Sequence, residues 1–290
     1  ADDTLDDILK KVECAAILGT MQATLTNIKG LRKKWLKNTK EEALVGVSLT
    51  GIMDHAFMNG TQKDNDITLE GFLSKLKRHA IATNRKWAER FHINQAAATT
   101  CVKPSGTVSQ LVDSASGIHA RHAPYYLRTV RADIKDPVAL LMKSNGIPCE
   151  ADVTAIDSTL IFSFPIKSPA DSLYRESLTA IEQLELWLIY NTHYTEHKVS
   201  MTISVKEHEW IDVAAWVYKH FDDISGVSFL PFSDHIYKQA PYQDLTEAEY
   251  NEWVAKMPET INWDDLADFE DNDKTTSTKE LACTGDNCEI

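Results

Sequence analysis

Residues 99–107 read Thr-Thr-Cys-Val-Lys-Pro-Ser-Gly-Thr and join two kinds of structure. The first four residues are a short run rich in β-branched side chains, which favour a strand. Pro104 and Gly106 then favour a loop, because proline fixes its own backbone angle and glycine permits tight turns. The sequence therefore predicts a strand that runs directly into a loop.

The loop 103–107 carries chemical groups that suit a phosphate. It offers several backbone N–H groups, the hydroxyls of Ser105 and Thr107, and the ammonium group of Lys103. Backbone amides in a turn or at a helix N-terminus bind anions. Proline, serine and glycine also form ordinary turns, so these residues alone leave both interpretations open.

Helices and strands are predicted on both sides of this loop. Before it, apolar residues at helical spacing predict helices over residues 5–24 and from an N-cap at Asp66 or Thr68 to Phe91. After it, strands are expected at 125–132, 160–164, 200–205 and 227–230, with Pro165 stopping the second. Further helices are expected at 137–145 after the N-cap Asp136, at 170–190 and at 207–221. This alternation predicts an α/β fold with mainly parallel strands.

Charge is concentrated at the end of the chain. The 290 residues are 43% hydrophobic and carry a formal net charge of −13, and residues 244–290 hold 14 Asp and Glu against 3 Lys. We therefore predict an acidic, partly disordered tail over 244–290. Acidity disfavours a nucleic-acid partner, which needs a basic surface. No membrane partner is expected either, because no apolar run approaches the roughly 20 residues that span a bilayer.

Two cysteines stand close together in the last eight residues. Cys283 and Cys288 enclose Gly285 and Asn287, which permit tight turns, so the pair can close a small disulfide loop. A dithiol on a flexible tether suits thiol–disulfide exchange. Chance proximity and zinc binding are the alternatives, although a cysteine pair gives zinc only two of its four ligands. The chain has 5 cysteines, an odd number, which fits a reducing, cytoplasmic location better than secretion.

Other candidate residues have simpler explanations. His119 and His122 flank Arg121, but the sequence places no further ligands beside them, so packing within a loop is favoured and no metal site is assigned. Trp210, Trp216 and Tyr218 are expected in a helix that packs on the core.

Several stretches of the chain together form a recognisable pattern. They are Leu-Gly-Thr-Met-Gln-Ala-Thr-Leu at 18–25, Gly-Val-Ser-Leu-Thr-Gly-Ile-Met-Asp-His at 46–55, Cys-Val-Lys-Pro-Ser-Gly-Thr-Val-Ser-Gln-Leu-Val-Asp at 101–113, Ser-Gly-Ile-His at 116–119, Pro-Tyr-Tyr-Leu-Arg-Thr-Val-Arg at 124–131, Ser-Phe-Pro at 163–165, His-Glu-Trp at 208–210, Gly-Val-Ser-Phe-Leu-Pro at 226–231 and the terminal cysteine pair. The pattern resembles the C-terminal part of a class II, adenosylcobalamin-dependent ribonucleotide reductase.

The resemblance implies a fold and a set of site residues. Residues 1–243 would form the C-terminal part of a ten-stranded α/β barrel of the ribonucleotide reductase type, followed by the flexible acidic tail. Pro104, Ser105, Gly106 and Thr107 would hold the phosphates of the ribonucleotide substrate. Cys283 and Cys288 would re-reduce an active-site disulfide and would be reduced in turn by thioredoxin or a similar reductant.

The implied reaction replaces the ribose 2′-OH by hydrogen through a thiyl radical formed with adenosylcobalamin, which yields deoxyribonucleotides for DNA synthesis. Triphosphates are favoured over diphosphates as substrates. The cofactor would carry the radical step while the protein positions the substrate.

One departure from the family is large. Its radical-forming cysteine lies in an Asn-Pro-Cys-Gly-Glu-like motif that this sequence lacks, and Cys14, Cys101 and Cys149 do not match its active-site redox pair. The N-terminal part of the reductase is therefore an expected partner. Two alternatives stay open: a noncatalytic remnant or nucleotide-binding module, and a fragment of a class I ribonucleoside-diphosphate reductase large subunit. Tyr125-Tyr126 could be that subunit's radical-transfer pair, but it follows the loop too closely.

Overall fold

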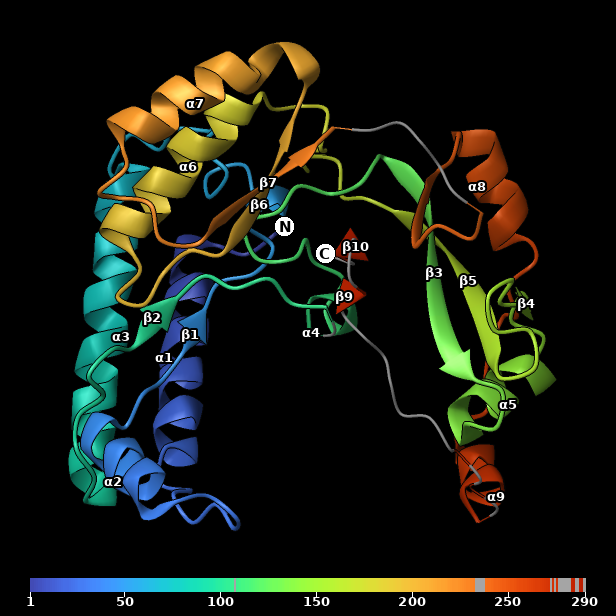
Figure 1. Ribbon diagram of the computed structural model, residues 1–290, viewed down its shortest axis with the longest axis horizontal. Coiled ribbons are helices and arrows are strands. Elements are labelled where there is room, and N and C mark those ends of the chain that lie inside the picture. The colour runs from blue at the N-terminus through green and yellow to red at the C-terminus, as the bar shows by residue number, and fades with distance from the viewer. Residues whose placement is uncertain are drawn as a thin grey trace. The chain divides into compact units, whose positions relative to one another are not determined.

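The computed structural model describes residues 1–106, 108–232, 238–271, 273 and 275, and the backbone of 283–284 and 287–288. The chain forms two compact units (Figure 1). Unit 1 comprises Ala1–Arg121 and Ala170–Ser233, and unit 2 comprises His122–Pro169 and Asp234–Ile290. The expected barrel portion ending at residue 243 stays a prediction.

Short parallel strands form the centre of unit 1. They are β1 (Val47–Ser48), β2 (Thr100–Cys101), β6 (Met201–Val205) and β7 (Val227–Pro231). β1 pairs with β2, and β6 pairs with β7. A parallel bridge between Val102 and Val199 joins the two pairs, which gives the order β1-β2-β6-β7.

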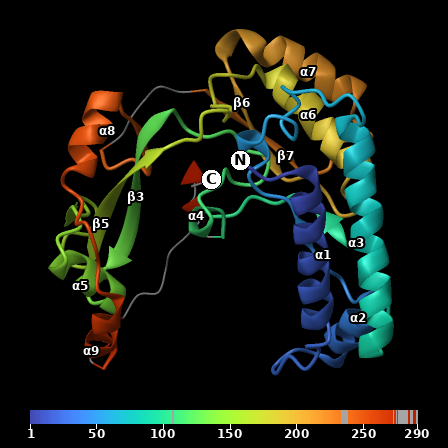
Figure 2. The same cartoon turned by 180° about the vertical axis from the view of Figure 1, so that it is seen from behind.

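Helices cover one face of these strands (Figures 1 and 2). They are α1 (Leu5–Gln22), α3 (Leu69–Phe91) and α6 (Ala180–His193). The predicted helices before the loop are confirmed, and the Thr68 hydroxyl caps α3 by accepting the Gly71 N–H. Both helices begin at a local cap and bury an apolar stripe, which are signals that a sequence carries by itself.

Alternation along the strands separates an apolar face from a polar one. Val47, Val102 and Ile203 belong to the core that the helices cover. The residues that alternate with these apolar residues belong to the opposite face of the strands. Many of them carry hydroxyls: Ser48, Ser200, Thr202, Ser204 and Ser228. The hydroxyls of Thr202 and Ser228 are hydrogen-bonded at 2.9 Å across β6 and β7.

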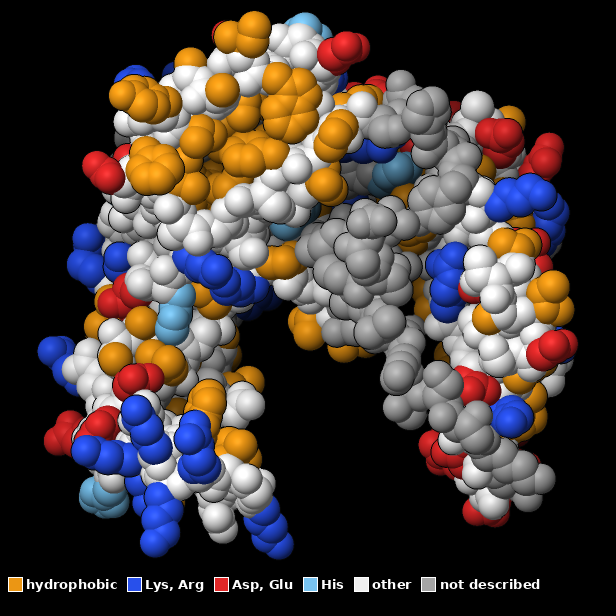
Figure 3. Space-filling model, in the orientation of Figure 1, with side chains coloured by type: hydrophobic (Ala, Val, Ile, Leu, Met, Phe, Trp, Pro, Cys, Tyr) orange, Lys and Arg blue, Asp and Glu red, His pale blue; other side chains and the backbone are white. Residues whose placement is uncertain are grey.

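The remaining elements of unit 1 lie around this centre. They are α2 (Lys33–Glu42), the 3-10 turns η1 (Ile52–Asp54) and η2 (Glu207–Glu209), α4 (Val108–Leu111) and α7 (Trp210–Lys219). Apolar side chains gather over α7 on the surface (Figure 3), where Tyr218 is 87% exposed. The expectation of core packing is therefore confirmed for Trp216 but wrong for Trp210 and Tyr218, which are exposed.

Unit 2 is built on an antiparallel sheet in the order β4-β5-β3-β8. Its strands are β3 (Tyr125–Asp133), β4 (Cys149–Ala151), β5 (Thr159–Lys167) and β8 (Tyr242–Asp244), and its helices and turn are α5 (Pro137–Ser144), α8 (Glu247–Val254), η3 (Trp263–Asp265) and α9 (Leu266–Glu270). Ala139, Ile147, Leu160 and Phe162 form its core.

The expectation of mainly parallel strands is wrong for unit 2. A buried apolar run such as 160–164 does not reveal the direction of its partner strand. The expectation that Pro165 stops this strand is also wrong, because β5 continues to Lys167. The Ser163 N–H donates to the Pro148 carbonyl, so it points toward β4. Backbone N atoms alternate in direction along a strand, so the Pro165 nitrogen points to the same side as that of Ser163. At Pro165 the strand has already passed the end of β4, so no N–H is needed there.

Another boundary differs from expectation. The helix expected at 170–190 begins only at Ala180, because Thr179 and Glu182 form a capping box. The acidic, partly disordered tail expected over 244–290 stays a prediction, and its first part contains the helices α8 and α9. Thr246 caps α8, which packs on β3 and β5, and α9 packs on α5.

In the described part of the chain, no helix has the length and apolar character needed to cross a membrane.

Candidate functional site

The loop that follows β2 keeps only part of its amide surface free. The Ser105 N–H donates to the Ser116 hydroxyl at 2.8 Å, and the Ser105 hydroxyl accepts the Ser109 N–H at 3.0 Å. The Gly106 N–H has no hydrogen-bond partner among the described residues. Thr107 lies outside those residues. An anion at this loop can therefore contact the Gly106 amide and the proton of the Ser105 hydroxyl.

A second segment, 115–117, supports this loop. Gly117 has φ +56°, and a Cβ added there would lie 2.7 Å from the Lys103 carbonyl oxygen. The Thr50 hydroxyl accepts the Gly117 N–H at 3.1 Å and donates to the Ala115 carbonyl at 3.0 Å. The close approach explains the glycine, because any larger residue would displace the start of the loop.

A buried ion pair holds the supporting segment in turn. The Asp54 carboxylate, 1% exposed, accepts the Ala115 N–H at 2.7 Å and the Ser172 hydroxyl at 2.8 Å. The Arg121 guanidinium contacts it through Nη2 at 2.9 Å and Nε at 3.0 Å. Buried charges persist only when paired and fully hydrogen-bonded. This pair therefore links η1 to the loop through Ala115 and Ser116.

His119 packs in this region, as expected for a histidine in a loop. Its Nε2 accepts the Thr202 N–H at 3.0 Å, which leaves Nδ1 to donate to the Ser116 carbonyl at 3.1 Å. Burial lowers the pKa of His119, so the ring is neutral. In unit 2, Nε2 of His122 lies 2.8 Å from the Asp244 carboxylate. The described residues contain no group of three potential metal ligands.

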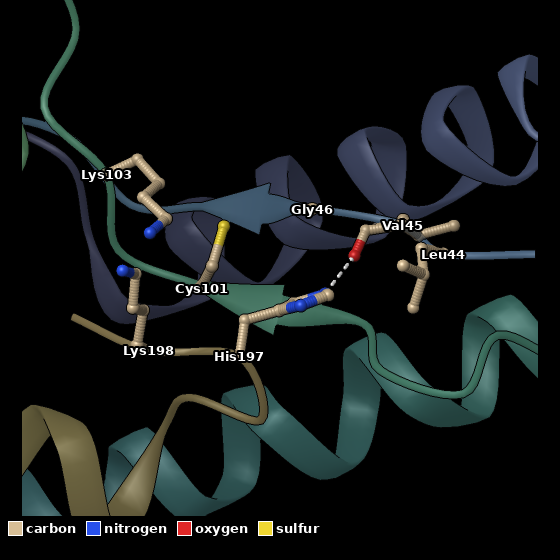
Figure 4. A pocket seen from close by; sticks show the side chains of 7 residues that line it. All are labelled: Leu44, Val45, Gly46, Cys101, Lys103, His197 and Lys198. Carbon is tan, nitrogen blue, oxygen red and sulfur yellow. Dashed lines mark hydrogen bonds between the residues drawn. The ribbon is translucent and has the colours of Figure 1, made fainter. Parts of the chain in front are cut away.

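A pocket of about 500 Å³ lies beside Lys103 in unit 1 (Figure 4). Cys101, Lys103, His197 and Lys198 line it together with residues 44–46. Nε2 of His197 is fixed on the Val45 carbonyl oxygen at 2.8 Å. Burial raises the pKa of the Cys101 thiol, which favours the neutral form over a reactive thiolate.

The terminal cysteines lie in two short antiparallel strands, β9 (Cys283–Thr284) and β10 (Asn287–Cys288). The backbone register pairs Cys283 with Cys288. Directly paired residues have Cα atoms about 4.5–5.5 Å apart, which lies within the range that a disulfide can bridge. The side chains of both residues lie outside the described part.

Sequence reasoning from the loop missed the residues that support it. The sequence motifs that contain Asp54, Thr50 and Ser116 indicated a family resemblance but no contact with the loop. No sequence pattern pointed to Lys198. The proline, serine and glycine of the loop were visible because their residue types restrict the backbone. Their partners come from distant segments, so local patterns could not identify them.

Comparisons with known proteins identify relatives along almost the whole chain. No protein-family model matches it. It is 27% identical over 300 residues to a probable adenosylcobalamin-dependent ribonucleoside-triphosphate reductase of Dictyostelium discoideum, covering 99% of this chain and 37% of that protein. The corresponding enzyme of Lactobacillus helveticus is 25% identical, with 85% of this chain and 36% of the relative covered. The chain thus spans just over a third of the length of these relatives.

A solved structure has the same fold. It is a crystal structure of a B12-dependent, class II ribonucleotide reductase, with a TM-score of 0.72 and 18% identity over 92% of this chain and 40% of that one. The α/β fold expected from the sequence is confirmed. So is the resemblance: the chain is similar in sequence to adenosylcobalamin-dependent ribonucleoside-triphosphate reductases and has the fold of part of a class II ribonucleotide reductase.

Proposed function

We propose that this chain is the C-terminal portion of an adenosylcobalamin-dependent ribonucleotide reductase that converts ribonucleoside triphosphates to deoxyribonucleotides in the cytoplasm, for DNA synthesis. The observation that carries the proposal is the similarity to triphosphate reductases over 99% of the chain. The rest of the enzyme would supply the radical-forming cysteine motif that this sequence lacks. The fold supports the same assignment, because it matches a class II reductase.

In this proposal unit 1 forms part of the wall of the ten-stranded barrel. Its parallel strands carry helices on one face, and the other face is rich in hydroxyl groups. A polar inner face suits a barrel that encloses a polar substrate. Thr202 and Ser228 would then face the barrel interior.

The loop would hold the phosphates of the substrate. Pro104 and Gly106 shape it, the Gly106 amide and the Ser105 hydroxyl would donate to phosphate oxygens, and Thr107 would add a second hydroxyl. Neutral donors bind an anion well when they are held in place before it arrives, because little ordering is then needed on binding. The hydrogen bond from Ser105 to Ser116 provides that support.

Cys283 and Cys288 would return electrons to the active site. In each turnover two active-site thiols become a disulfide while the 2′-OH leaves as water. A thiolate of the terminal pair attacks that disulfide, the second terminal thiol resolves the mixed disulfide, and the pair is left oxidised. Thioredoxin or a similar reductant then reduces it. The register of β9 and β10 supports this role, since it pairs the two cysteines.

Adenosylcobalamin would supply the radical through cleavage of its cobalt–carbon bond. The pocket of about 500 Å³ beside Lys103 is the size of a site for a drug-sized molecule, whereas this cofactor is much larger. This pocket therefore does not fit the cofactor by itself, and we assign none of its residues to the cofactor.

The test is to combine the chain with the N-terminal portion of a class II triphosphate reductase and to assay deoxynucleotide formation with adenosylcobalamin. In the active mixture, Cys283→Ser with Cys288→Ser should abolish multiple turnover with thioredoxin but leave a single turnover intact. Cys14→Ser, which removes an exposed cysteine elsewhere, is the matched control. Unchanged multiple turnover in the double variant would refute the shuttle role.

The same assay separates the alternatives. A noncatalytic remnant or nucleotide-binding module, which the missing cysteine motif favours, would yield no product with any N-terminal portion. A class I diphosphate reductase fragment would require a separate radical-generating subunit instead of the cofactor. The names of the relatives in Dictyostelium and Lactobacillus speak against that fragment.

A further inference from the structure

The pocket beside the loop contains two cations that face each other. Lys103 and Lys198 extend from different segments, and their ammonium groups point toward one another, to the left of the Cys101 sulfur in the view of Figure 4. The stem of Lys198 lies against Gly226, where an added Cβ would stand 3.0 Å from its Cδ. A glycine at that position therefore leaves the space that the lysine stem occupies.

Among the described residues, no carboxylate forms an ion pair with either lysine. Lys10, Lys11 and Lys37 by contrast form ion pairs with Asp or Glu. Within the described structure the positive charge of the two lysines is therefore not balanced by a neighbouring acid, although the formal net charge of the chain is −13.

The electrostatic situation of Lys103 agrees with this geometry. Burial is the main cause that lowers its pKa, and the nearby Lys198 ammonium lowers it further. Two like charges held together destabilise one another unless an anion lies between them. The groups that face Lys103 in the pocket are Lys198, the Cys101 thiol and the His197 ring. Of these, only Cys101 acts to raise the pKa of Lys103, and burial of the thiol favours its neutral form.

Lys103 also connects the pocket to the phosphate loop. It immediately precedes Pro104, so their Cα atoms are only about 3.8 Å apart. The loop offers neutral donors, the Gly106 amide and the Ser105 hydroxyl, while the pocket offers two positive charges. Neutral donors that lie directly beside a cation in the sequence suit a chain of phosphates, whose terminal group carries the most negative charge.

We propose that Lys103 and Lys198 bind the terminal phosphoryl group of a nucleoside triphosphate whose other phosphates lie on the loop. This inference rests on the proposed function and adds a basis for choosing triphosphates over diphosphates. A diphosphate would contact the loop but would be too short to lie between the two ammonium groups.

The test measures binding of inorganic tripolyphosphate, pyrophosphate, a nucleoside triphosphate and its diphosphate to the 290-residue chain by calorimetry. Lys198→Gln should weaken triphosphate and tripolyphosphate binding by about tenfold or more, as expected for a lost charged hydrogen bond, and should change diphosphate binding less than about twofold. Lys198→Arg should restore most of the affinity. Lys75→Gln, which removes an exposed charge on α3, controls for the change in net charge.

A second measurement reports on the site directly. Lysine side-chain NMR should show the pKa of Lys103 rising when tripolyphosphate binds and also, in the free chain, when Lys198 is replaced by Gln. The inference would be overturned if Lys198→Gln lost affinity equally for the nucleoside diphosphate and the triphosphate. It would also be overturned if the unaltered chain did not bind tripolyphosphate. If the unaltered chain binds polyphosphates as proposed but the reconstituted enzyme forms no deoxynucleotide, the proposed function fails while the lysine site stands.

Discussion

His119 joins the support of the loop to strand β6 through both of its ring nitrogens. The Thr202 N–H already donates to Nε2, so a proton cannot be added there without losing that hydrogen bond. Burial lowers the pKa of the ring for the same reason that it disfavours any charge away from water. The neutral ring is thus part of the folded structure of unit 1.

Stability should consequently fall in mild acid. Below about pH 6.5 the unfolded chain binds a proton at His119 that the folded chain does not, so the free energy of unfolding decreases by up to about 1.4 kcal/mol per pH unit until the lowered folded pKa is reached. Urea unfolding between pH 8 and pH 5 measures this slope. His119→Gln should flatten it, whereas the exposed His208→Gln should not. Equal slopes in the two variants would contradict the assignment.

Gly117 combines a left-handed backbone with a close contact. Gly117→Ala places a methyl group 2.7 Å from the Lys103 carbonyl oxygen, so the start of the loop must move. We expect a loss of about 1–3 kcal/mol in unfolding free energy together with weaker polyphosphate binding. Gly60→Ala is the matched control, since Gly60 has φ +80° but no neighbour within 4 Å. The unfolding free energy of Gly60→Ala should fall, while its polyphosphate affinity should stay unchanged. Equal losses of polyphosphate affinity in both variants would argue against a specific role for the contact at Gly117.

At the scale of elements, the segment 114–119 fixes the conformation of the loop at 104–106. It is attached to Asp54 through Ala115, to Ser105 through Ser116 and to β6 through His119. Irregular segments of this kind keep one conformation only when their polar groups are satisfied by fixed partners. The hydrogen bonds of this segment therefore prepare the loop before any ligand binds.

Ser116→Ala tests that preparation. The change removes the acceptor of the Ser105 N–H and should lower the unfolding free energy by about 0.5–1.5 kcal/mol. Polyphosphate affinity should fall as well, because the loop must then be ordered on binding. Ser114→Ala is the control, since the buried Ser114 hydroxyl has no hydrogen-bond partner within the described structure. Affinity that stays unchanged in Ser116→Ala would show that the loop does not need this support.

Elements with local signals could be predicted from the sequence, and those without could not. α1, α3 and α5 begin at the caps Thr4, Thr68 and Asp136, which are short-range features. The direction in which β3 and β5 pair depends on the path of the chain between them, which no residue in either strand encodes. α2 was missed because none of its residues is buried, so no apolar stripe marks it.

At the scale of the whole molecule, the candidate site is assembled from distant parts of the chain. The loop at 104–106 could be identified from its residue types, but Asp54 and Lys198 reach it only through the parallel order β1-β2-β6-β7. Such contacts follow from the three-dimensional path of the backbone rather than from neighbouring residues. The resemblance to a reductase supplied the function that we propose for the loop. The hydrogen bonds that support the loop and the lysine pair became visible only in the fold.

The order of the parallel strands leaves two outer rims. Within the described residues, β1 pairs with β2 alone and β7 with β6 alone, so each rim presents amide and carbonyl groups to whatever lies beside it. Such rims readily recruit strands from neighbouring molecules. At high concentration the chain should therefore tend to associate through these strand edges. Lysine substitutions along the exposed edge of β7 should reduce that association.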